Sequence, residues 1–460
     1  MAVMKVMARI KARLGDLWWY TLVMVCAQRF GDVVNMFTGL WLVPRYVPQA
    51  ELGAVLPLLQ VGNVLGLPLM IVMGPFVKYL NTYATHGEYG KVKSLLRDGC
   101  VLVFLMFLGA MLYARVVLPP VFERMRVAEG SLGLLIVLSG VVAASAPIAT
   151  TALQGLKKFR MITYVNLVGA PLRLAAMLVF LPIRGLSGYF VGQTLPTLLA
   201  LGMSFFGLRH VFSRSVRAES YWRTDGKRML AYLVPFGVFV VLGVMQGAVE
   251  TFVIRHRLSD LESAAYYMIS RFAEAGAYMG STLIFVSFPL IAERHEKGQS
   301  SEHLLWQSMG GTLIVGLLLA LVFYYVGAWI LGWSEFWRPY AAYSPTMAVL
   351  TVVFALRLAT ACFFNHEMAC HRFSFLRYYS VVLVVELVVL YGLTGYRFFS
   401  PLIPPAWMTL VEAFNPCRLP VVLGVMLVFT LLPFGAVLVH ALRRPGQAGA
   451  GVSKHEDPNE

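Results

Sequence analysis

RYVPQAELGAVLPLLQVGNVLG begins at Arg45, and a second stretch, RHRLSDLESAAYYMISRFAEAG, begins at Arg255. Arg45 aligns with Arg255 at a spacing of 210 residues, and after a one-residue insertion Glu51 aligns with Glu262. The same alignment then pairs polar residues of the helices that follow, Gln60 with Arg271 and Asn63 with Glu274. HGEYGK at 86–91 and LKKFR at 156–160 have similar counterparts at 294–299 and 370–374. The sequence therefore predicts two related halves.

The composition places both halves in a lipid bilayer. The mean hydropathy is +0.71, 58% of the 460 residues are hydrophobic and 13% are charged. A soluble domain of ordinary composition is far less apolar. The chain is therefore expected to be a membrane protein.

Runs of about 20 apolar residues, the length that a helix needs to cross the hydrocarbon layer, predict twelve spans. Their approximate bounds are 18–45, 52–77, 99–118, 131–154, 161–183, 185–208, 229–254, 263–292, 304–333, 340–364, 375–396 and 413–442. The runs are continuously apolar and do not alternate every second residue, which favours helices over barrel strands. The predicted fold is an all-α polytopic membrane protein.

The repeat and the spans together predict the organisation of the chain. We expect an amphipathic lead-in at 1–16, a six-helix lobe at 17–208, a basic linker at 209–228, a second six-helix lobe at 229–442 and a disordered tail at 443–460. An even number of helices per lobe relates the lobes by a pseudo-twofold axis along the membrane normal, with a substrate path between them near the midplane.

Lysine and arginine set the predicted orientation. With both termini in the cytoplasm, the cytoplasmic segments contain 24 basic residues and the opposite connections contain nine. The positive-inside rule therefore places both termini in the cytoplasm. The net charge of +15 is dispersed over short loops, so anionic lipid headgroups explain it and no nucleic-acid partner is expected. The cysteines and histidines form no pattern that indicates a metal site, and no cofactor is expected.

Polar side chains interrupt four of the spans. An ionisable group at the centre of a span is costly, so it is expected to face a cavity or a partner. The candidate cavity and substrate-binding residues are Gln28, Arg29, Asp32 and Asn35 in helix one, Gln60 and Asn63 in helix two, Gln246 and Glu250 in helix seven, and Arg271 and Glu274 in helix eight. In helix one, 28, 32 and 35 share one helical face.

Three further intramembrane charges are secondary candidates. Arg357 and Glu386 could pair between helices ten and eleven, and Arg173 in helix five could extend to the interface or bind a carbonyl. Arg29 with Asp32, and Arg271 with Glu274, could also be ion pairs that only neutralise each other. Both interpretations remain open at this point.

The order of elements resembles the multidrug/oligosaccharidyl-lipid/polysaccharide exporter superfamily, and within it the polysaccharide and O-antigen flippases. The residues that carry the resemblance are VPRYVPQAELG at 43–53, ALQGLKKFR at 152–160, ETFVIRHRLSDLESAAYYMISRF at 250–272 and FPLIAERHEKG at 288–298. The resemblance implies two lobes around a central cavity lined by helices one, two, seven and eight. It also implies a bacterial inner-membrane location, a lipid-linked glycan as substrate, and membrane lipids and a glycan polymerase or ligase as partners.

Three classes of function follow for comparison. A flippase for a polyprenyl-diphosphate glycan would use arginine for the phosphates, because a guanidinium binds those oxygens through two parallel hydrogen bonds. A cation-coupled multidrug antiporter would use Asp32, Glu250 and Glu274, but an arginine beside two of these favours the charged carboxylate and hinders proton cycling. A membrane enzyme would need a large external loop, and the longest candidate, at 395–416, is short and mostly apolar, so we expect no enzyme.

Overall fold

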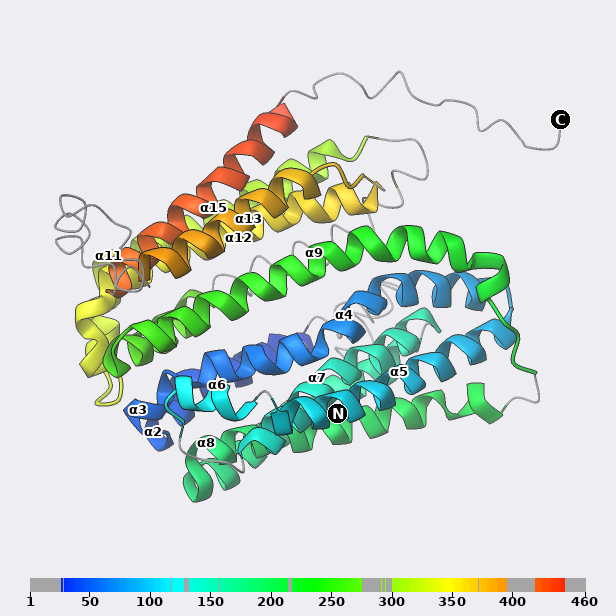
Figure 1. The fold of residues 1–460 in the computed structure, drawn as a ribbon, viewed down its shortest axis with the longest axis horizontal. Helices are drawn as coiled ribbons and strands as arrows, with labels where there is room; N and C mark the ends of the chain where they lie inside the picture. The colour runs from blue at the N-terminus through cyan, green and yellow to red at the C-terminus, as the bar shows by residue number, and fades with distance from the viewer. Residues whose placement is uncertain are drawn as a thin grey trace, which may run out of the picture. The chain divides into compact units, whose positions relative to one another are not determined.

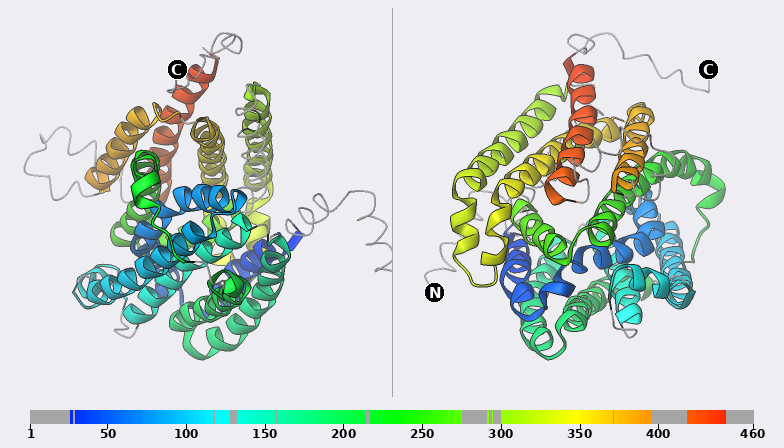
Figure 2. Two further views of the ribbon diagram at one scale, coloured as in Figure 1. Left: turned by 90° about the vertical axis from the view of Figure 1, so that its right-hand side faces the viewer. Right: turned by 60° about the vertical axis from the view of Figure 1, so that its left-hand side comes forward.

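The structure is a computed structural model, and its description covers most of the helical part of the chain (Figure 1). The described residues are 26–27, 29–116, 118–127, 132–156, 158–213, 217–274, 291, 294, 300–370, 372–394 and 418–442. Gln28, the lead-in at 1–16 and the tail at 443–460 lie outside them. The described segments are helices joined by short connections, and Figure 2 shows them from two further sides. The chain is an all-α multi-pass membrane protein.

Each of the twelve predicted spans contains described helical residues, and the part of span 263–292 at 275–290 lies outside the described residues. Helix one contains residues 29–37, the π-helical turn η1 (Thr38–Leu42) and α2 (Val43–Tyr46). The next elements are α3 (Gln49–Leu52), α4 (Val55–Thr85), α5 (Tyr89–Val116), α6 (Leu118–Arg124), α7 (Leu132–Gly155), α8 (Phe159–Ser213) and α9 (Trp222–Arg257). Residues 260–274 are helical, and they precede α11 (Glu302–Gly332), the 3₁₀ turn η2 (Arg338–Tyr343), α12 (Ser344–Ala369), α13 (Leu376–Thr394) and α15 (Leu419–Leu442). Eight helices in the described ranges are long and apolar enough to cross a membrane.

Two predicted spans form one continuous element, α8, which reverses direction at Gly185. Gly185 has φ +49° and ψ −123°, a conformation that glycine adopts without a steric penalty. Glycines beyond the reversal pack closely against residues before it: Gly188 on Phe180, Gly192 on Met177 and Gly207 on Met161. The residue numbers rise on one arm as they fall on the other, so the arms are antiparallel. The predicted break between 183 and 185 is therefore in the right place.

Helix α4 packs against α7 through a pair of glycines. A Cβ atom on Gly140 would lie 2.6 Å from the Cα atom of Gly62, and four residues further along each helix Gly66 approaches Ala144. Both contacts join residues 78 positions apart, so α4 and α7 run in the same direction. Small residues at such a spacing allow two helix backbones to approach closely in a membrane.

The opposite face of α4 packs against α9 along the length of both helices. The contacts are the hydroxyl of Tyr83 with Asp225, the side chain of Ile71 with Gly237, and the amide of Gln60 with Gly247. Residue numbers fall on α4 as they rise on α9, so this pair is antiparallel. We name these contacts the α4–α9 seam. It joins the second helix of the first repeat to the first helix of the second repeat.

The chain divides into two compact units, Met1–Ala264 and Ala265–Glu460. The first unit therefore includes α9, which the sequence assigns to the second repeat. The linker predicted at 209–228 is largely helical, because α8 continues to Ser213 and α9 begins at Trp222. In the second unit α11 and α12 are antiparallel, with Gly316 against Ala355 and Gly327 against Ser344.

The repeat is visible in the local backbone. Val47 ends α2 in an extended conformation, and Leu258 ends α9 in the same way. The amide of Val47 donates to the carbonyl of Val43 (2.9 Å), and the amide of Leu258 donates to that of Ile254 (3.1 Å). Val47 and Leu258 are 211 residues apart in the chain, and so are Val43 and Ile254. The next helix begins two residues after each extended residue, at 49 and at 260.

Candidate functional site

The first polar group lies on helix one and on the first arm of α8. Arg29 Nη1 is 2.9 Å from Asp32 Oδ2, and these side chains are 30% and 22% exposed. Arg173 Nη1, from α8, donates to Asn35 Oδ1 at 2.6 Å. Asp32 and Asn35 are three residues apart, so Arg173 extends the polar face of helix one. We name Arg29, Asp32, Asn35 and Arg173 the helix-one cluster.

The helix-one cluster ends at an irregular part of the helix. The π turn η1 begins at Thr38, and the Thr38 hydroxyl donates to the carbonyl of Val34 at 2.8 Å. A single π turn inside an α-helix is frequent at functional sites. The sequence identified Asp32 and Asn35 from their shared face and Arg29 at the edge of that face, but it did not place Arg173 beside them.

The second polar group lies on the α4–α9 seam. Asn63 Nδ2 donates to Gln60 Oε1 at 2.9 Å. The Gln60 side chain packs closely on Gly247 of α9: a Cβ atom built on Gly247 would lie 3.1 Å from Gln60 Nε2. Gln246 and Glu250 flank Gly247 on α9, and Glu250 is only 2% exposed. The structure thus brings together candidate residues of helices two and seven, which are almost 190 positions apart in the chain.

The third polar group lies in the second unit, on the helix at 260–274. Arg271 Nη1 is 2.9 Å from Glu274 Oε2, and the Arg271 guanidinium lies 5.4 Å from the centre of the Tyr267 ring. Arg271 and Arg29 therefore share a pattern, an arginine followed three residues later by a carboxylate. The convergence of the two arginines on a common cavity stays a prediction.

The secondary pair predicted between helices ten and eleven is present. Arg357 Nη2 on α12 is 3.1 Å from Glu386 Oε1 on α13, and Arg357 Nε donates to Thr430 Oγ1 on α15 at 3.2 Å. Glu386 is fully buried. One arginine thus joins three helices of the second unit, as expected of a structural contact.

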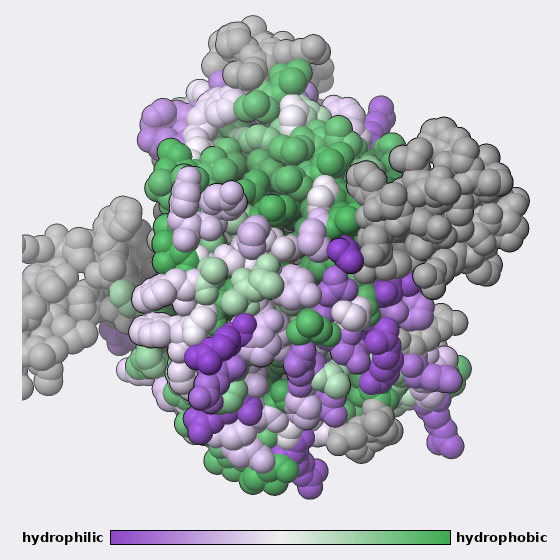
Figure 3. Space-filling view, turned by 90° about the vertical axis from the view of Figure 1, so that its left-hand side faces the viewer, coloured by the Kyte–Doolittle hydropathy of each residue, from purple (hydrophilic) through white to green (hydrophobic). Residues whose placement is uncertain are grey.

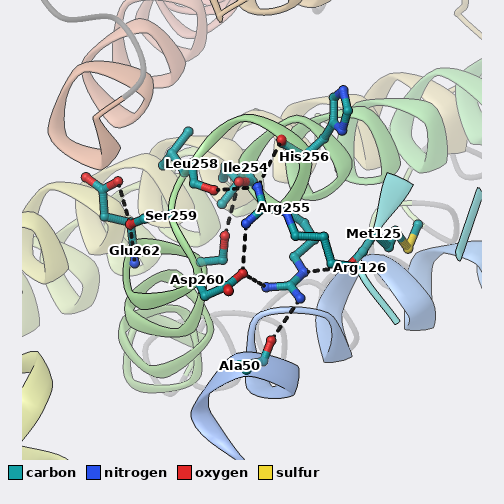
Figure 4. A network of polar contacts seen from close by, with 11 residues as sticks. Ala50, Met125, Arg126, Ile254, Arg255, His256, Leu258, Ser259, Asp260 and Glu262 are labelled. Atoms are coloured by element: carbon teal, nitrogen blue, oxygen red, sulfur yellow. Dashed lines mark hydrogen bonds and ion pairs between the residues drawn. The ribbon is translucent and has the colours of Figure 1, made fainter. Parts of the chain in front are cut away.

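A fourth polar group, which the sequence did not predict, surrounds Arg255 at the end of α9 (Figure 4). Arg255 donates to the carbonyl of Met125 at 2.9 Å, to the carbonyl of Ala50 at 2.8 Å and to Asp260 Oδ1 at 2.8 Å. Arg126 Nη1 donates to the same Asp260 oxygen at 3.0 Å. We name these five residues the Arg255 network. In the sequence, Arg255 counted only as a loop charge, and its alignment with Arg45 was the one signal that marked it.

The Arg255 network joins three connections that are predicted, from the charge distribution alone, to lie outside the cytoplasm. Ala50 lies in α3, Met125 and Arg126 follow α6, and Asp260 begins the helix after α9. Figure 3 views the molecule from the left-hand side of Figure 1, where α3 and the last turn of α9 lie, and shows hydrophilic residues gathered on its lower part. This distribution is expected of an end that meets water.

At the other end of the seam, aromatic hydroxyl groups bind carboxylates. Tyr83 donates to Asp225 Oδ2 at 2.8 Å, and Tyr221 donates to Asp98 Oδ2 at 3.0 Å. Burial, followed by the contact with the aspartate, raises the pKa of both phenols, so both remain neutral donors at physiological pH. The first turn of α9 is therefore fixed to α4, and the residue before α9 is fixed to α5.

These groups contain several hydrogen-bond donors and acceptors. Within the described ranges, no three His, Cys, Asp or Glu side chains gather in a way that could hold a metal ion. The intramembrane polar groups instead combine guanidinium, amide and carboxylate functions, which can bind anions and hydroxyl groups through directed hydrogen bonds.

Comparison with known proteins shows the fold. No protein-family description and no curated protein matches the chain. A multidrug resistance MATE family transporter of the MOP superfamily in an inward-facing conformation is similar over 92% of this chain and 98% of its own, with a TM-score of 0.64 and 12% identity. A multidrug resistance MATE family transporter of the MOP superfamily in an outward-facing conformation is similar over 96% of this chain and 99% of its own, with a TM-score of 0.62 and 12% identity.

A MOP superfamily transporter from Pyrococcus furiosus is similar over 95% of this chain and 97% of its own, with a TM-score of 0.59 and 11% identity. Its binding pocket is described as having reverse polarity, which suggests a different function for that protein. The chain therefore has the fold of these transporters over nearly its whole length.

Proposed function

We propose that the protein is a MOP-type membrane transporter of the polysaccharide-flippase branch, which moves the head of a lipid-linked oligosaccharide from the cytoplasmic to the outer leaflet. The observation that carries the proposal is the helix-one cluster. It places Arg29 beside Asp32 and Arg173 beside Asn35, on two neighbouring intramembrane helices. The fold likeness supports transport, and the cluster supports an anionic substrate.

The chemistry of the cluster suits a diphosphate. A guanidinium remains charged at all physiological pH values and presents planar N–H donors that match phosphate oxygens. Asn35 and Asp32 offer oxygen acceptors to sugar hydroxyl groups beside it. The candidate residues Gln60, Asn63 and Gln246 on the α4–α9 seam add amides of the same kind.

The lipid part of the substrate fixes the mode of transport. Each buried CH₂ contributes about 0.8 kcal/mol, so a polyprenyl chain of tens of carbons remains in the bilayer while the head crosses. A head with two negative charges moving outward is favoured by about 2.3 kcal/mol per charge for each 100 mV of potential, negative inside. The membrane potential can therefore drive the proposed direction without a coupled ion.

The second candidate function is a cation-coupled multidrug antiporter. The observation in its favour is Glu250, a carboxylate that is 2% exposed within α9, together with the MATE transporters of the same fold. The Pyrococcus furiosus transporter supports treating substrate class as separate from fold, since its pocket polarity is described as reversed. We favour the flippase because Arg29 and Arg173 outnumber the one carboxylate of their cluster.

The remaining features of the proposal follow from the flippase assignment. We place the protein in the bacterial inner membrane with both termini in the cytoplasm, among membrane lipids. A glycan polymerase or ligase on the outer side would use the translocated lipid-linked glycan, and the protein itself would catalyse no reaction.

The test is transport in liposomes with a fluorescent polyprenyl-diphosphate sugar. We expect Arg29→Gln and Arg173→Gln each to reduce translocation about tenfold or more, since each removes a charge-assisted hydrogen bond to the phosphates. Arg184→Gln is the matched control, because Arg184 lies exposed on the same helix as Arg173. Unchanged translocation in both variants would refute the headgroup role. Exchange of an organic cation for protons or sodium, abolished by Glu250→Gln, would instead support the antiporter.

A further inference from the structure

Arg255 is fully buried although it lies at the end of a membrane helix. It is 1% exposed, and its guanidinium contacts two backbone carbonyls and one carboxylate. Carbonyls near a helix end that lack a partner within the helix are bound by side chains, water or ligands. Here the carbonyls of Ala50 and Met125 are bound by a single side chain from α9, more than 120 residues away in the chain.

The two halves of the repeat differ at this position. Arg45, which the sequence alignment pairs with Arg255 but which the 211-residue spacing of the backbone pairs with His256, is exposed and lies over the ring of its own neighbour, Tyr46. Arg255 instead joins α9 to the connection after helix one and to the connection after α6. The repeat alone therefore does not require a buried arginine.

The network closes one end of the α4–α9 seam. Beside it, a Cβ atom on Gly53 would lie 2.5 Å from Ser263 Cβ, and Ser263 is 1% exposed. Backbone lies against backbone here, so no rotation of a side chain can open a passage. A passage between Gly53 and the helix at 260–274 requires these two segments to separate.

The network also lies at the border of the two compact units. Asp260 begins the helix at 260–274, and the first unit ends at Ala264 within that helix. The same helix continues into the second unit, where it carries Arg271 and Glu274. Asp260 therefore lies eleven residues before Arg271 in the chain.

We propose that Arg255 is a positioning residue of the transport cycle, which holds the extracytoplasmic end of α9 closed on α3 and on the segment after α6 and is released when that end opens. The proposal rests on the proposed transport function. It identifies the contact that must break for the substrate head to leave on the outer side. Arg126 shares the acceptor Asp260 and supports the closed arrangement from the exposed side.

The test measures the accessibility of position 263. In a variant that lacks the five native cysteines, Ser263→Cys is exposed to a membrane-impermeant maleimide added from outside. We expect slow labelling with Arg255 present and at least about tenfold faster labelling with Arg255→Gln, since at least one charge-assisted hydrogen bond that keeps the site closed is lost. Arg255→Lys should give an intermediate rate, because a lysine retains the charge but cannot hold all three acceptors.

Arg45→Gln is the matched control, because it removes the aligned arginine that is exposed, and we expect its labelling within about twofold of the parent. If Arg255→Gln protein does not elute as a folded species, Asp260→Asn provides the same test by weakening both arginine contacts. Equal labelling of parent and folded network variants, or an equal rise with Arg45→Gln, would overturn the proposal. Faster labelling in a protein that moves no lipid-linked sugar would leave the network in place and refute only the proposed substrate.

Discussion

Replacing Gly140 with alanine should separate α4 from α7. The new Cβ atom would lie 2.6 Å from Gly62 Cα and 2.9 Å from the Gly62 carbonyl oxygen. Carbon atoms in ordinary contact are about 3.5–4.0 Å apart, so the helices must move apart by about 1 Å at this point. Both partners are backbone, and no side chain can rotate to relieve the contact. The separation would also disturb the next contact, between Gly66 and Ala144.

Overpacking of this kind costs about 1–3 kcal/mol of unfolding free energy. The assay is denaturant-induced unfolding in detergent micelles, followed by tryptophan fluorescence. Gly109→Ala in α5 is the control, since a Cβ atom at Gly109 meets nothing within 4 Å, and it should be neutral or stabilising by up to about 1 kcal/mol. If Gly140→Ala is no less stable than Gly109→Ala, the inference that glycine contacts determine the α4–α7 packing is wrong.

Three further outcomes are expected. Gly185→Ala should lower the unfolding free energy by about 1–3 kcal/mol, because an alanine is strained at φ +49°, and thermal unfolding in detergent would measure it. Glu386→Ala should cost about 3–5 kcal/mol by leaving Arg357 without its carboxylate, whereas the double variant Glu386→Leu with Arg357→Met should recover most of this loss in the same assay. Ser259→Ala should cost about 1 kcal/mol, because the Ser259 hydroxyl accepts from the amide of Glu262 at the start of the helix, and Glu262→Gln should be nearly neutral.

Hydropathy was sufficient to predict most of the fold. The length of an apolar run is set by the thickness of the bilayer, so each predicted span has a helical counterpart in the described chain. The reversal of α8 was placed within two residues, because Arg184 and Gly185 interrupt an otherwise apolar stretch. Helix ends were less predictable. Helix α9 begins at Trp222, seven residues before the predicted span, since a helix can continue into water beyond the hydrocarbon layer.

The partners of individual polar residues could not be predicted from the sequence. The spacing of Asp32 and Asn35 fixes their shared face, but the contact of Asn35 with Arg173 depends on how two helices are rotated against each other. Arg255 was misjudged for a different reason. Charge counting treats every loop arginine as a topological signal and contains no information on burial, whereas the structure buries Arg255 against two backbone carbonyls. The role of the candidate site residues in transport stays a prediction.

The reversal at Gly185 has a consequence for the synthesis of the protein. Its two arms are joined without a loop, and both are apolar over a candidate span of 50 residues. The translocation machinery therefore has to accept the arms as a single inserting unit with Arg184 at its tip. The first arm already carries Arg173 in its apolar part, so a second charge introduced there should add about 2.5–3.5 kcal/mol to the cost of inserting both arms together.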